Sequence, residues 1–471
     1  TLNMADYRFP KETELPRNGL SAQADATSHN EPPLGRQLNN VPGPAQVWRA
    51  WWTVGLLSSL YIISYIDRII PSLLVGPLKA AFNVGDAHIG LLFGAAFAVF
   101  YGFLGLPAAR LADRGNRKKL ILAGVAIWSL CTIGSGLAGT FIALVLLRMG
   151  VAIGEAVLSP AAYSMIGSMF TPERRFLPSA IYAASGNVGT YGAYITGASV
   201  LGWAASDGSV FFDRFSVWQV VFFCVGVPGL LIGILFFATT FEPVRDGDET
   251  TEASGLPQVT RFFFQHTHLF GGLFLGASLI TIVIFAFGAW VPEYLHRSQG
   301  WSVEQAGLSY GITGLCCSVI GTLAFSSLAE SLTRNGIRDG LVLVASAGAA
   351  LGCAAAGLAA IQTNGIGALI CLGVMVFCLT GCSNLIVISN QFTVPARFRA
   401  TAIAIMFMCT ILIGLGLGPP LVAWLSSISA NPADLGPALA IISFAVLVPA
   451  TALIYVTRKH YATQLERGVV D

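Results

Sequence analysis

The sequence predicts an all-α polytopic membrane protein with twelve transmembrane helices in two six-helix bundles. Of its 471 residues, 55% are hydrophobic and only 11% are charged, and the mean hydropathy is +0.71. Soluble domains carry about 25% charged residues. The apolar runs of this chain reach the roughly 18 residues or more that a helix needs to cross the hydrocarbon core of a bilayer. Composition and run length therefore place the chain among membrane-spanning proteins.

Twelve apolar runs can be counted along the chain. They cover approximately residues 51–76, 86–109, 119–138, 140–168, 176–203, 216–241, 268–292, 302–328, 338–361, 364–392, 400–427 and 435–457. The longest internal connection, residues 242–267, is polar and separates six runs from six. A short internal sequence repeat supports that division, because Leu-Ala-Asp ends the second run at 111–113 and Leu-Ala-Glu ends the eighth at 328–330. Two repeated halves related by a pseudo-two-fold axis, with a site between them near the midplane, are typical of secondary transporters.

These runs divide the chain into five parts. We expect residues 1–50 to be a disordered cytoplasmic tail, because they are polar, include six prolines and show no apolar period. Residues 51–241 would form the N-terminal bundle and residues 268–457 the C-terminal bundle. Residues 242–267 would be a cytoplasmic loop between them, and residues 458–471 a second cytoplasmic tail.

Lysine and arginine are distributed unequally between the two sets of loops. One set contains three basic residues, Lys79, Arg214 and Arg297. The other set, with the C-terminal tail, contains 16: Arg110, Arg114, Arg117, Lys118, Lys119, Arg174, Arg175, Arg245, Arg261, Arg334, Arg338, Arg397, Arg399, Arg458, Lys459 and Arg467. Because cytoplasmic loops carry an excess of basic residues, we expect both termini in the cytoplasm, with the protein in the inner or plasma membrane of the cell.

Four ionisable residues lie inside apolar runs, where a charged side chain at a helix centre costs about 2.5 to 3.5 kcal/mol on insertion scales. Asp67 and Arg68 are in the first run, and Arg148 and Glu155 are in the fourth. Asp67 lies about 14 Å from the outer end of its run and Arg148 about 12 Å from the outer end of the fourth, so the two are level. Helical side chains lean toward their own N-terminus, so Arg68 and Glu155 lean toward each other. The sequence therefore predicts a charge-neutral cluster between these two helices.

This cluster has two interpretations. In the first it is a proton switch, because desolvation favours a protonated Asp67 or Glu155 while an arginine partner favours the charged carboxylate. Protonation would then release an arginine and favour one conformation of the carrier. In the second, the cluster is a permanent ion-pair set that holds the helices together. Ionisable groups inside a membrane usually have a functional role, which favours the switch.

The sequence at residues 110–119, Arg-Leu-Ala-Asp-Arg-Gly-Asn-Arg-Lys-Lys, resembles the signature loop of the major facilitator superfamily, G-x-L-A-D-R-x-G-R-K/R. Ala109 and Asn116 stand where that pattern has glycine. The form Asp-Arg-x-Asn-Arg-Lys, the Tyr-Ile-Asp-Arg at 65–68, and Arg148 followed by Gly-Glu-Ala at 154–156 resemble the spinster branch. The resemblance covers the N-terminal half, and the C-terminal half matches in span count and loop pattern. It implies the major facilitator fold and a proton-linked carrier of lysolipids or sphingoid lipids.

The signature loop also suggests a conformational latch. Asp113 at the end of one helix can accept hydrogen bonds from the N-terminus of a neighbouring helix, while Arg114 and Arg117 can bind carboxylates or carbonyls. We expect such contacts to hold the two halves together at the cytoplasmic side when the carrier faces outward. The alternative is that these basic residues only anchor the topology.

Candidate substrate contacts are aromatic and amide side chains inside the runs. They are Phe97, Tyr101, Asn187 and Tyr191 in the first half and Phe285, Trp290, Tyr310 and Asn384 in the second. An amphipathic lipid needs an apolar cavity wall with arginine or amide groups for its head, and this set supplies both. Each of these residues also has a simpler interpretation as a packing or interfacial side chain.

The other functional classes find little support. No nucleophile with a base, phosphate-binding loop or metal-ligand set is present, so we expect no enzyme, no metal and no cofactor, with protons as the coupling ion. The net charge of +2 without a basic stripe gives no reason to expect nucleic acid as a partner. The nine cysteines fall inside the runs as small packing residues. We expect a monomer that contacts membrane lipid. A drug or organic-anion carrier, and a non-transporting receptor or channel, remain alternatives.

Overall fold

The structure is a computed structural model that describes residues 44–171, 174–206, 214–243, 256–429, 431 and 433–467. The tail expected to be disordered is described only from Pro44 onward, where a helix already begins. Three segments lie outside the described residues. They are residues 1–43, for which disorder was predicted, residues 244–255 of the predicted connection, and the last residues, 468–471.

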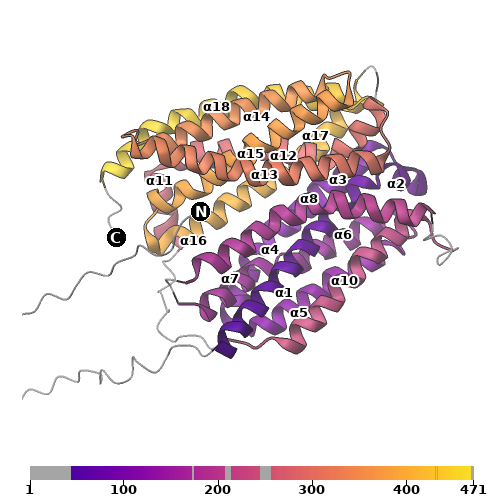
Figure 1. Cartoon of the computed structure of the whole chain (residues 1–471), viewed down its shortest axis with the longest axis horizontal. Helices are drawn as coiled ribbons and strands as arrows, with labels where there is room; N and C mark the ends of the chain where they lie inside the picture. The colour runs from indigo at the N-terminus through magenta and orange to yellow at the C-terminus, as the bar shows by residue number, and fades with distance from the viewer. Residues whose placement is uncertain are drawn as a thin grey trace, which may run out of the picture. The chain divides into compact units, whose positions relative to one another are not determined.

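Helices account for each of the first six predicted spans (Figure 1). They are α1 (Pro44–Ile69), α3 (Asp86–Phe93) with α4 (Ala95–Arg114), α5 (Arg117–Ser135), α6 (Phe141–Glu155) with α7 (Leu158–Met169), α8 (Phe176–Ser206) and α10 (Val217–Thr239). The short helices η2 (Ile70–Leu73) and α2 (Val75–Phe82) connect α1 to α3. Residues 48–239 are called the first half below.

The second half, residues 267–467, repeats this number of spans. Its helices are α12 (Thr267–Gln299), α13 (Val303–Arg334), α14 (Gly340–Ala360), α15 (Gly365–Thr393), the composite of α16 (Ala396–Cys409), η3 (Thr410–Leu415) and α17 (Gly416–Ser427), and α18 (Gly436–Arg467). A short helix, α11 (Leu256–Gln265), precedes α12. The predicted architecture of twelve spanning helices in two groups of six is thus confirmed.

Two details differ from the sequence expectation. Eleven helices of the described chain are long and apolar enough to span a membrane by themselves, and α8 is not among them. The glycine, serine, asparagine and tyrosine residues of α8 lower its hydropathy, although it is 31 residues long. Helix α18 runs on to Arg467, past the predicted end at residue 457, because hydropathy marks only the part of a helix inside the hydrocarbon core while backbone hydrogen bonding continues beyond it.

Two facing spans are interrupted, one just before Pro419 and the other at Gly94. Pro419 cannot donate a hydrogen bond to the carbonyl of Leu415, four residues earlier, and the helix there is wound as the π-type segment η3. The second span breaks at Gly94, where an added Cβ atom would lie 2.7 Å from that same Leu415 carbonyl oxygen and 2.7 Å from the Pro420 ring. Only glycine allows the two backbones to approach so closely.

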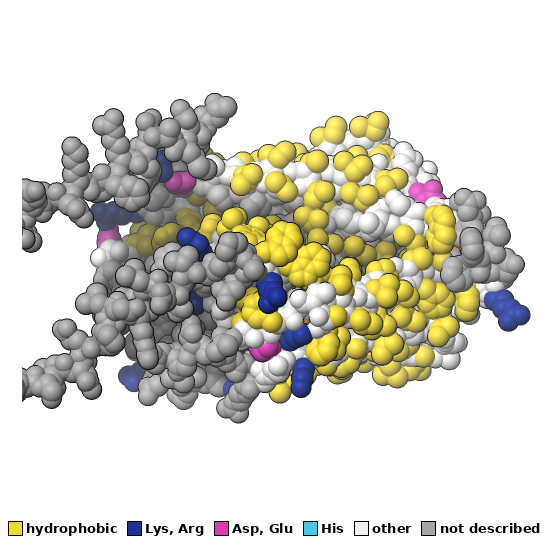
Figure 2. Space-filling view, turned by 60° about the horizontal axis from the view of Figure 1, so that its bottom comes forward, with side chains coloured by type: hydrophobic (Ala, Val, Ile, Leu, Met, Phe, Trp, Pro, Cys, Tyr) yellow, Lys and Arg dark blue, Asp and Glu magenta, His cyan; other side chains and the backbone are white. Residues whose placement is uncertain are grey.

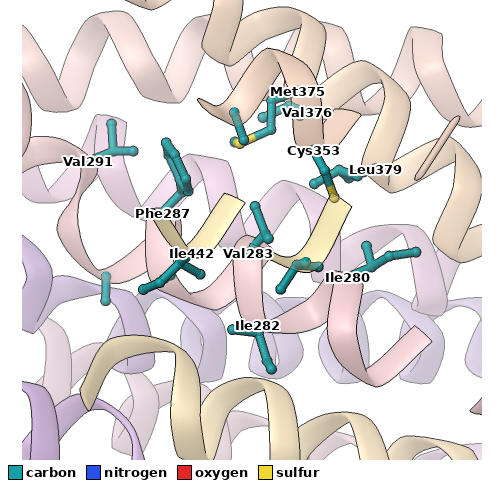
Figure 3. Close-up of a cluster of buried hydrophobic side chains, with 14 of the residues drawn as sticks. Ile280, Ile282, Val283, Phe287, Val291, Cys353, Met375, Val376, Leu379 and Ile442 are labelled. Atoms are coloured by element: carbon teal, nitrogen blue, oxygen red, sulfur yellow. The ribbon is translucent and has the colours of Figure 1, made fainter. Parts of the chain in front are cut away.

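The buried apolar side chains form two clusters, a larger one that runs through both halves and a smaller one mainly in the first half. In the first half α5 packs against α6 and α10, and in the second half α14 packs against α15 and α18. Figure 3 shows Phe287 and Val283 of α12 facing Met375 and Leu379 of α15, with Cys353 of α14 beside them. The nine cysteines are free thiols. Large apolar side chains also remain exposed on the outside, as expected of an integral membrane protein, and Figure 2 shows hydrophobic side chains covering much of the visible face.

The two halves meet mainly along two seams. Helix α8 packs against α13, and α3 packs against α17. The first seam includes Gly307, whose Cβ position would lie 2.9 Å from the Ala198 side chain. Both seams are nearest to the end of the bundle where α3 begins and α12 ends. This end is called the Asp86 end, and the opposite end, where α5 begins and α13 ends, is called the Arg117 end.

Candidate functional site

Local helix signals place three of the four ionisable residues at helix ends, and Arg148 lies in the middle of α6. Asp67 and Arg68 lie in the last turn of α1, which ends at Ile69 because Pro71 disfavours helical geometry in the residue before it. Glu155 is the last residue of α6, and the helix is interrupted at residues 156–157. Pro160 lacks the N–H group that would bond the carbonyl of residue 156, which accounts for this interruption.

Asp67 is fully engaged by its neighbours. Its Oδ1 atom accepts a hydrogen bond from Arg148 Nη1 at 2.7 Å, and its backbone oxygen accepts one from Arg148 Nη2 at 3.1 Å. The hydroxyl of Thr132 on α5 donates to its other carboxylate oxygen, Oδ2. Asp67 is 1% exposed and Arg148 3% exposed. Both carboxylate oxygens therefore have partners, and this pair ties α1 to α5 and α6.

Arg68 and Glu155 form a second ion pair, and this one is incompletely satisfied. Arg68 Nη2 donates to Glu155 Oε2 at 2.6 Å, and the Glu155 side chain is fully buried. Arg68 Nε and Glu155 Oε1 are both buried and find no hydrogen-bond partner within the described part of the chain. A buried donor or acceptor without a partner costs about 1 to 3 kcal/mol. One donor and one acceptor are therefore left for a proton, a water molecule or a ligand.

Three aromatic rings surround the guanidinium of Arg68. Its Cζ atom lies 4.8 Å from the ring centroid of Tyr65 and 4.7 Å from those of Phe97 and Tyr101. A desolvated cation over an aromatic face gains up to about 2 kcal/mol from each such contact. Two of the predicted substrate contacts, Phe97 and Tyr101, thus lie directly against the ion-pair site. The rings can hold the arginine cation in place even when its carboxylate partner is neutral.

Further tyrosines extend this aromatic surface along α1, α7 and α8. Tyr61 stacks on Tyr182 with ring centroids 4.6 Å apart, and Tyr163 packs edge-on against Tyr182 at 5.1 Å. The hydroxyl groups of Tyr61 and Tyr65 are within hydrogen-bonding distance at 3.4 Å. None of Tyr61, Tyr65, Tyr163 and Tyr182 was among the predicted contacts. Their spacing of four residues on α1 is a signal that could have found the first two.

Four of the other predicted contact residues make their contacts elsewhere. Tyr191 and Tyr310 meet edge-on across the α8–α13 seam, with ring centroids 6.1 Å apart. Trp290 is fully buried and donates to the backbone oxygen of Pro419 at 3.0 Å. Asn384 donates to Ser326 at 3.2 Å within the second half. The last two are Asn187, which is half-buried on α8, and Phe285, which packs against the apolar interior of the first half.

Arg117, predicted to be part of a latch, is buried at the Arg117 end. It donates to Glu242 Oε1 at 2.7 Å, to Ser168 Oγ at 2.7 Å and to the backbone oxygen of Pro243 at 2.6 Å. These contacts join α5 to α7 and to the residues that follow α10. The described partners of Arg117 thus belong to the first half and to the start of the connection. The side chains of Asp113 and Arg114 lie outside the described residues.

Within the described residues, no group of three or more histidine, cysteine, aspartate or glutamate side chains is placed to hold a metal ion. The site brings together carboxylates, arginines and tyrosines, which are groups that form ion pairs and hydrogen bonds.

Comparisons with known proteins identify the family of this chain. Residues 57–419 match the model of the Major Facilitator Superfamily. An MFS-type efflux pump of Mycolicibacterium smegmatis is 28% identical over 290 residues, which cover 61% of this chain and 64% of the pump. The sphingosine-1-phosphate transporter SPNS2 of Xenopus tropicalis is 27% identical over 469 residues, which cover 91% of this chain and 87% of the relative.

Solved structures give the same result. A bacterial homologue of the human lysosomal transporter spinster, in an inward-facing and unoccupied conformation, has a TM-score of 0.73 and 26% sequence identity, over 90% of this chain and 98% of that one. The alignment with the efflux pump covers less than two thirds of the pump's length. The family model, by contrast, covers most of this chain, including both ion pairs and the α8–α13 seam. The chain therefore belongs to the Major Facilitator Superfamily.

Proposed function

We propose that this protein is a proton-coupled secondary transporter of an amphipathic lipid, of the lysophospholipid or sphingoid type, that works by rocker-switch alternating access. The observation that carries the proposal is the contrast between the two buried ion pairs. Asp67 has a partner for each carboxylate oxygen, whereas Arg68 and Glu155 each keep a buried polar atom without one.

Glu155 is the proton acceptor in this proposal. A proton on Asp67 would break its ion pair with Arg148 and strand a buried arginine, which costs about 3 to 5 kcal/mol. A proton on Glu155 would cost less free energy, because Arg68 retains its three aromatic neighbours and the Arg68 side chain is 10% exposed. The Asp67–Arg148 pair is then a permanent brace, and the Arg68–Glu155 pair is the one that opens.

The same surroundings favour a substrate with a charged head. Once Glu155 is neutral, the guanidinium of Arg68 can bind a phosphate or carboxylate with paired hydrogen bonds. The tyrosine faces beside it attract an ammonium group. The rest of such a lipid is apolar and would lie against side chains such as Phe97 and Phe285. The sphingosine-1-phosphate transporter among the relatives carries a molecule of this kind according to its name.

The seams between the halves support the proposed alternating access. If the basic loops are cytoplasmic, the Asp86 end faces outward, and the seams close the carrier on that side. This arrangement fits the similarity to a structure solved in an inward-facing conformation. Movement of the halves about the Arg68–Glu155 region would open the Asp86 end and expose the site to the other side of the membrane. We place the protein as a monomer in the cell membrane.

Counterflow in proteoliposomes tests the proposal. Vesicles loaded with unlabelled lysophospholipid should accumulate labelled lysophospholipid, at a rate that changes with pH. The variant Glu155→Gln should keep counterflow and lose its pH dependence, because exchange does not require net proton movement. Glu242→Gln is the matched control, since Glu242 also pairs with an arginine but lies outside the site, and its pH dependence should remain. Unchanged pH dependence in Glu155→Gln would refute the assignment.

One specific observation favours a second candidate, a drug or organic-anion carrier. The mycobacterial relative is named an efflux pump, and an arginine in an aromatic surround also suits planar organic anions. The same vesicles, tested with organic anions and cationic dyes, decide between the two. Saturable counterflow of those compounds with none of lysolipid would favour this candidate. Absence of counterflow for every compound would favour a receptor or channel.

A further inference from the structure

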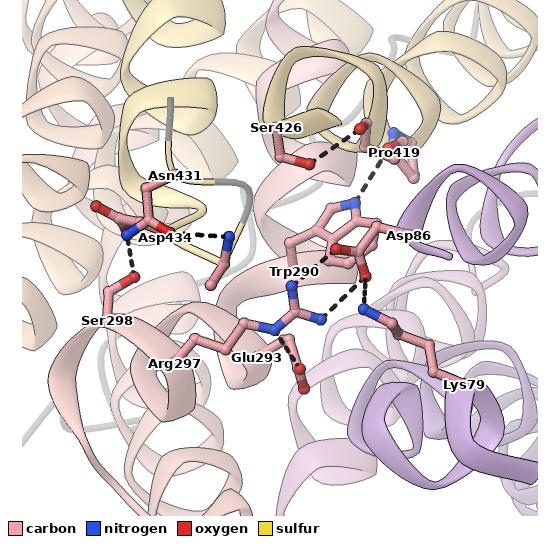
Figure 4. Close-up of polar contacts among 12 residues, drawn as sticks. Lys79, Asp86, Trp290, Glu293, Arg297, Ser298, Pro419, Ser426, Asn431 and Asp434 are labelled. Atoms are coloured by element: carbon pink, nitrogen blue, oxygen red, sulfur yellow. Dashed lines mark hydrogen bonds and ion pairs between the residues drawn. The ribbon is translucent and has the colours of Figure 1, made fainter. Parts of the chain in front are cut away.

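A second cluster of charged side chains lies at the Asp86 end, far from the proposed proton site. Lys79 Nζ of α2 donates to Asp86 Oδ1 at 2.8 Å. Arg297 of α12 donates to the same carboxylate through both terminal nitrogens, at 2.8 Å to Oδ2 and 3.0 Å to Oδ1. Its Nε atom donates to Glu293 Oε1 at 2.6 Å. Figure 4 shows the four side chains in a row of alternating charge.

The positions of Asp86 and Arg297 in their helices strengthen the pair. Asp86 is in the first turn of α3 and Arg297 is in the last turn of α12. An acid is stabilised by the positive end of its own helix and a base by the negative end, and here the two helix ends meet. The bidentate geometry of an arginine on a carboxylate also restricts how the two helices can be oriented.

This pair is distinguished by what it connects. Lys79 and Asp86 belong to the first half, and Glu293 and Arg297 belong to the second. Among the ion pairs of the described residues, Asp86–Arg297 is the one that joins the two halves. Both side chains are largely buried, at 13% and 14% exposed, so solvent screens their attraction less than at an open surface.

We propose that Asp86 and Arg297 form a clasp that keeps the two halves closed at this end and that must separate before the site can open there. Lys79 and Glu293 are positioning residues, because each holds one member of the clasp from within its own half. The role in a transport cycle rests on the proposed alternating access. The effect of the clasp on closure does not, and it can be measured without any substrate.

Apolar contacts below the clasp limit how far its loss can act. Phe93 of α3 and Trp290 of α12 have ring centroids 6.1 Å apart. An added Cβ atom at Gly90 would lie 2.9 Å from Ala423 of α17, so these backbones are also in close contact. We therefore expect that breaking the clasp raises the population open at this end by about tenfold and leaves the protein folded.

Hydrogen–deuterium exchange of the full chain in phosphatidylcholine nanodiscs tests this inference. Asp86→Asn and Arg297→Gln should each speed exchange in α2, α3 and the end of α12, by about tenfold. Exchange at the Arg117 end, in α5 and α16, should slow or stay the same. Lys79→Gln leaves the cross-half pair in place and should change exchange by much less than Asp86→Asn. Asp339→Asn is a further control, because Asp339 pairs with Arg458 within the second half.

Each outcome of this experiment either supports or overturns the proposed clasp. Faster exchange confined to the Asp86 end in the two clasp variants supports the inference. Faster exchange at both ends would mean general destabilisation and would overturn it, as would no change at all. An effect of Lys79→Gln equal to that of Asp86→Asn would also overturn it, since the cluster would then only stabilise the first half. A chain that transports nothing could still show the supporting pattern, so the two proposals can fail separately.

Discussion

Removal of the charge from either buried acid of the ion-pair site should destabilise the protein, but to different degrees. Asp67→Asn takes the counter-charge from Arg148, which is 3% exposed and has no aromatic ring recorded over its guanidinium in the described residues. Leaving that arginine buried and unpaired should lower the free energy of unfolding by about 3 to 5 kcal/mol. Glu155→Gln takes the counter-charge from Arg68, which keeps three aromatic neighbours at 4.7 to 4.8 Å. We expect a loss of about 1 to 3 kcal/mol there.

The measurement is the free energy of unfolding of each variant in mixed detergent micelles titrated with a denaturing detergent. Asp67→Asn should be less stable than Glu155→Gln by about 2 kcal/mol. Thr132→Val provides an internal control, because it removes one hydrogen bond to Asp67 without removing a charge and should cost about 1 to 3 kcal/mol. If Glu155→Gln proves equally or more destabilising than Asp67→Asn, the assignment of one pair as brace and the other as switch is wrong.

Three further predictions concern single contacts. Arg68→Lys should weaken lysolipid binding by about tenfold, measured by thermal shift, because an ammonium group cannot contact three rings and a carboxylate together. The control Tyr101→Phe keeps its aromatic ring and should bind lysolipid nearly as before. Gly94→Ala should loosen the α3–α17 seam, because the added Cβ atom would lie 2.7 Å from the Leu415 backbone oxygen. The expected result is faster hydrogen exchange in α3 and α17, and unchanged exchange would argue against a tight seam. Arg117→Gln should make the chain after α10 more sensitive to limited proteolysis, and equal cleavage rates would contradict its anchoring role.

The sequence was sufficient for properties that add up along one helix. Counting apolar runs placed all twelve spans, although among the described residues the hydropathy of α8 is too low for that helix to be recognised as a span on its own. Depth along a helix is also linear in residue number, so the sequence could bring Asp67 level with Arg148 and Arg68 toward Glu155. The structure shows both pairs, at 2.7 and 2.6 Å.

Tertiary structure alone decided how completely each charged group is satisfied. Thr132 reaches Asp67 from α5, and Phe97 and Tyr101 of α4 reach Arg68 of α1, because of how neighbouring helices are rotated about their axes. Nothing in a single helix encodes that rotation.

The Asp86–Arg297 pair illustrates the same limit over a longer distance. Its members are 211 residues apart. In the sequence, Arg297 was one of the three basic residues in the set of loops with few lysines and arginines. Composition and periodicity determined that this chain spans a membrane in two repeated halves with a buried charge cluster. Only the contact between the halves decided that Asp86 meets Arg297, because pairing energy depends on distances between atoms that no local pattern specifies.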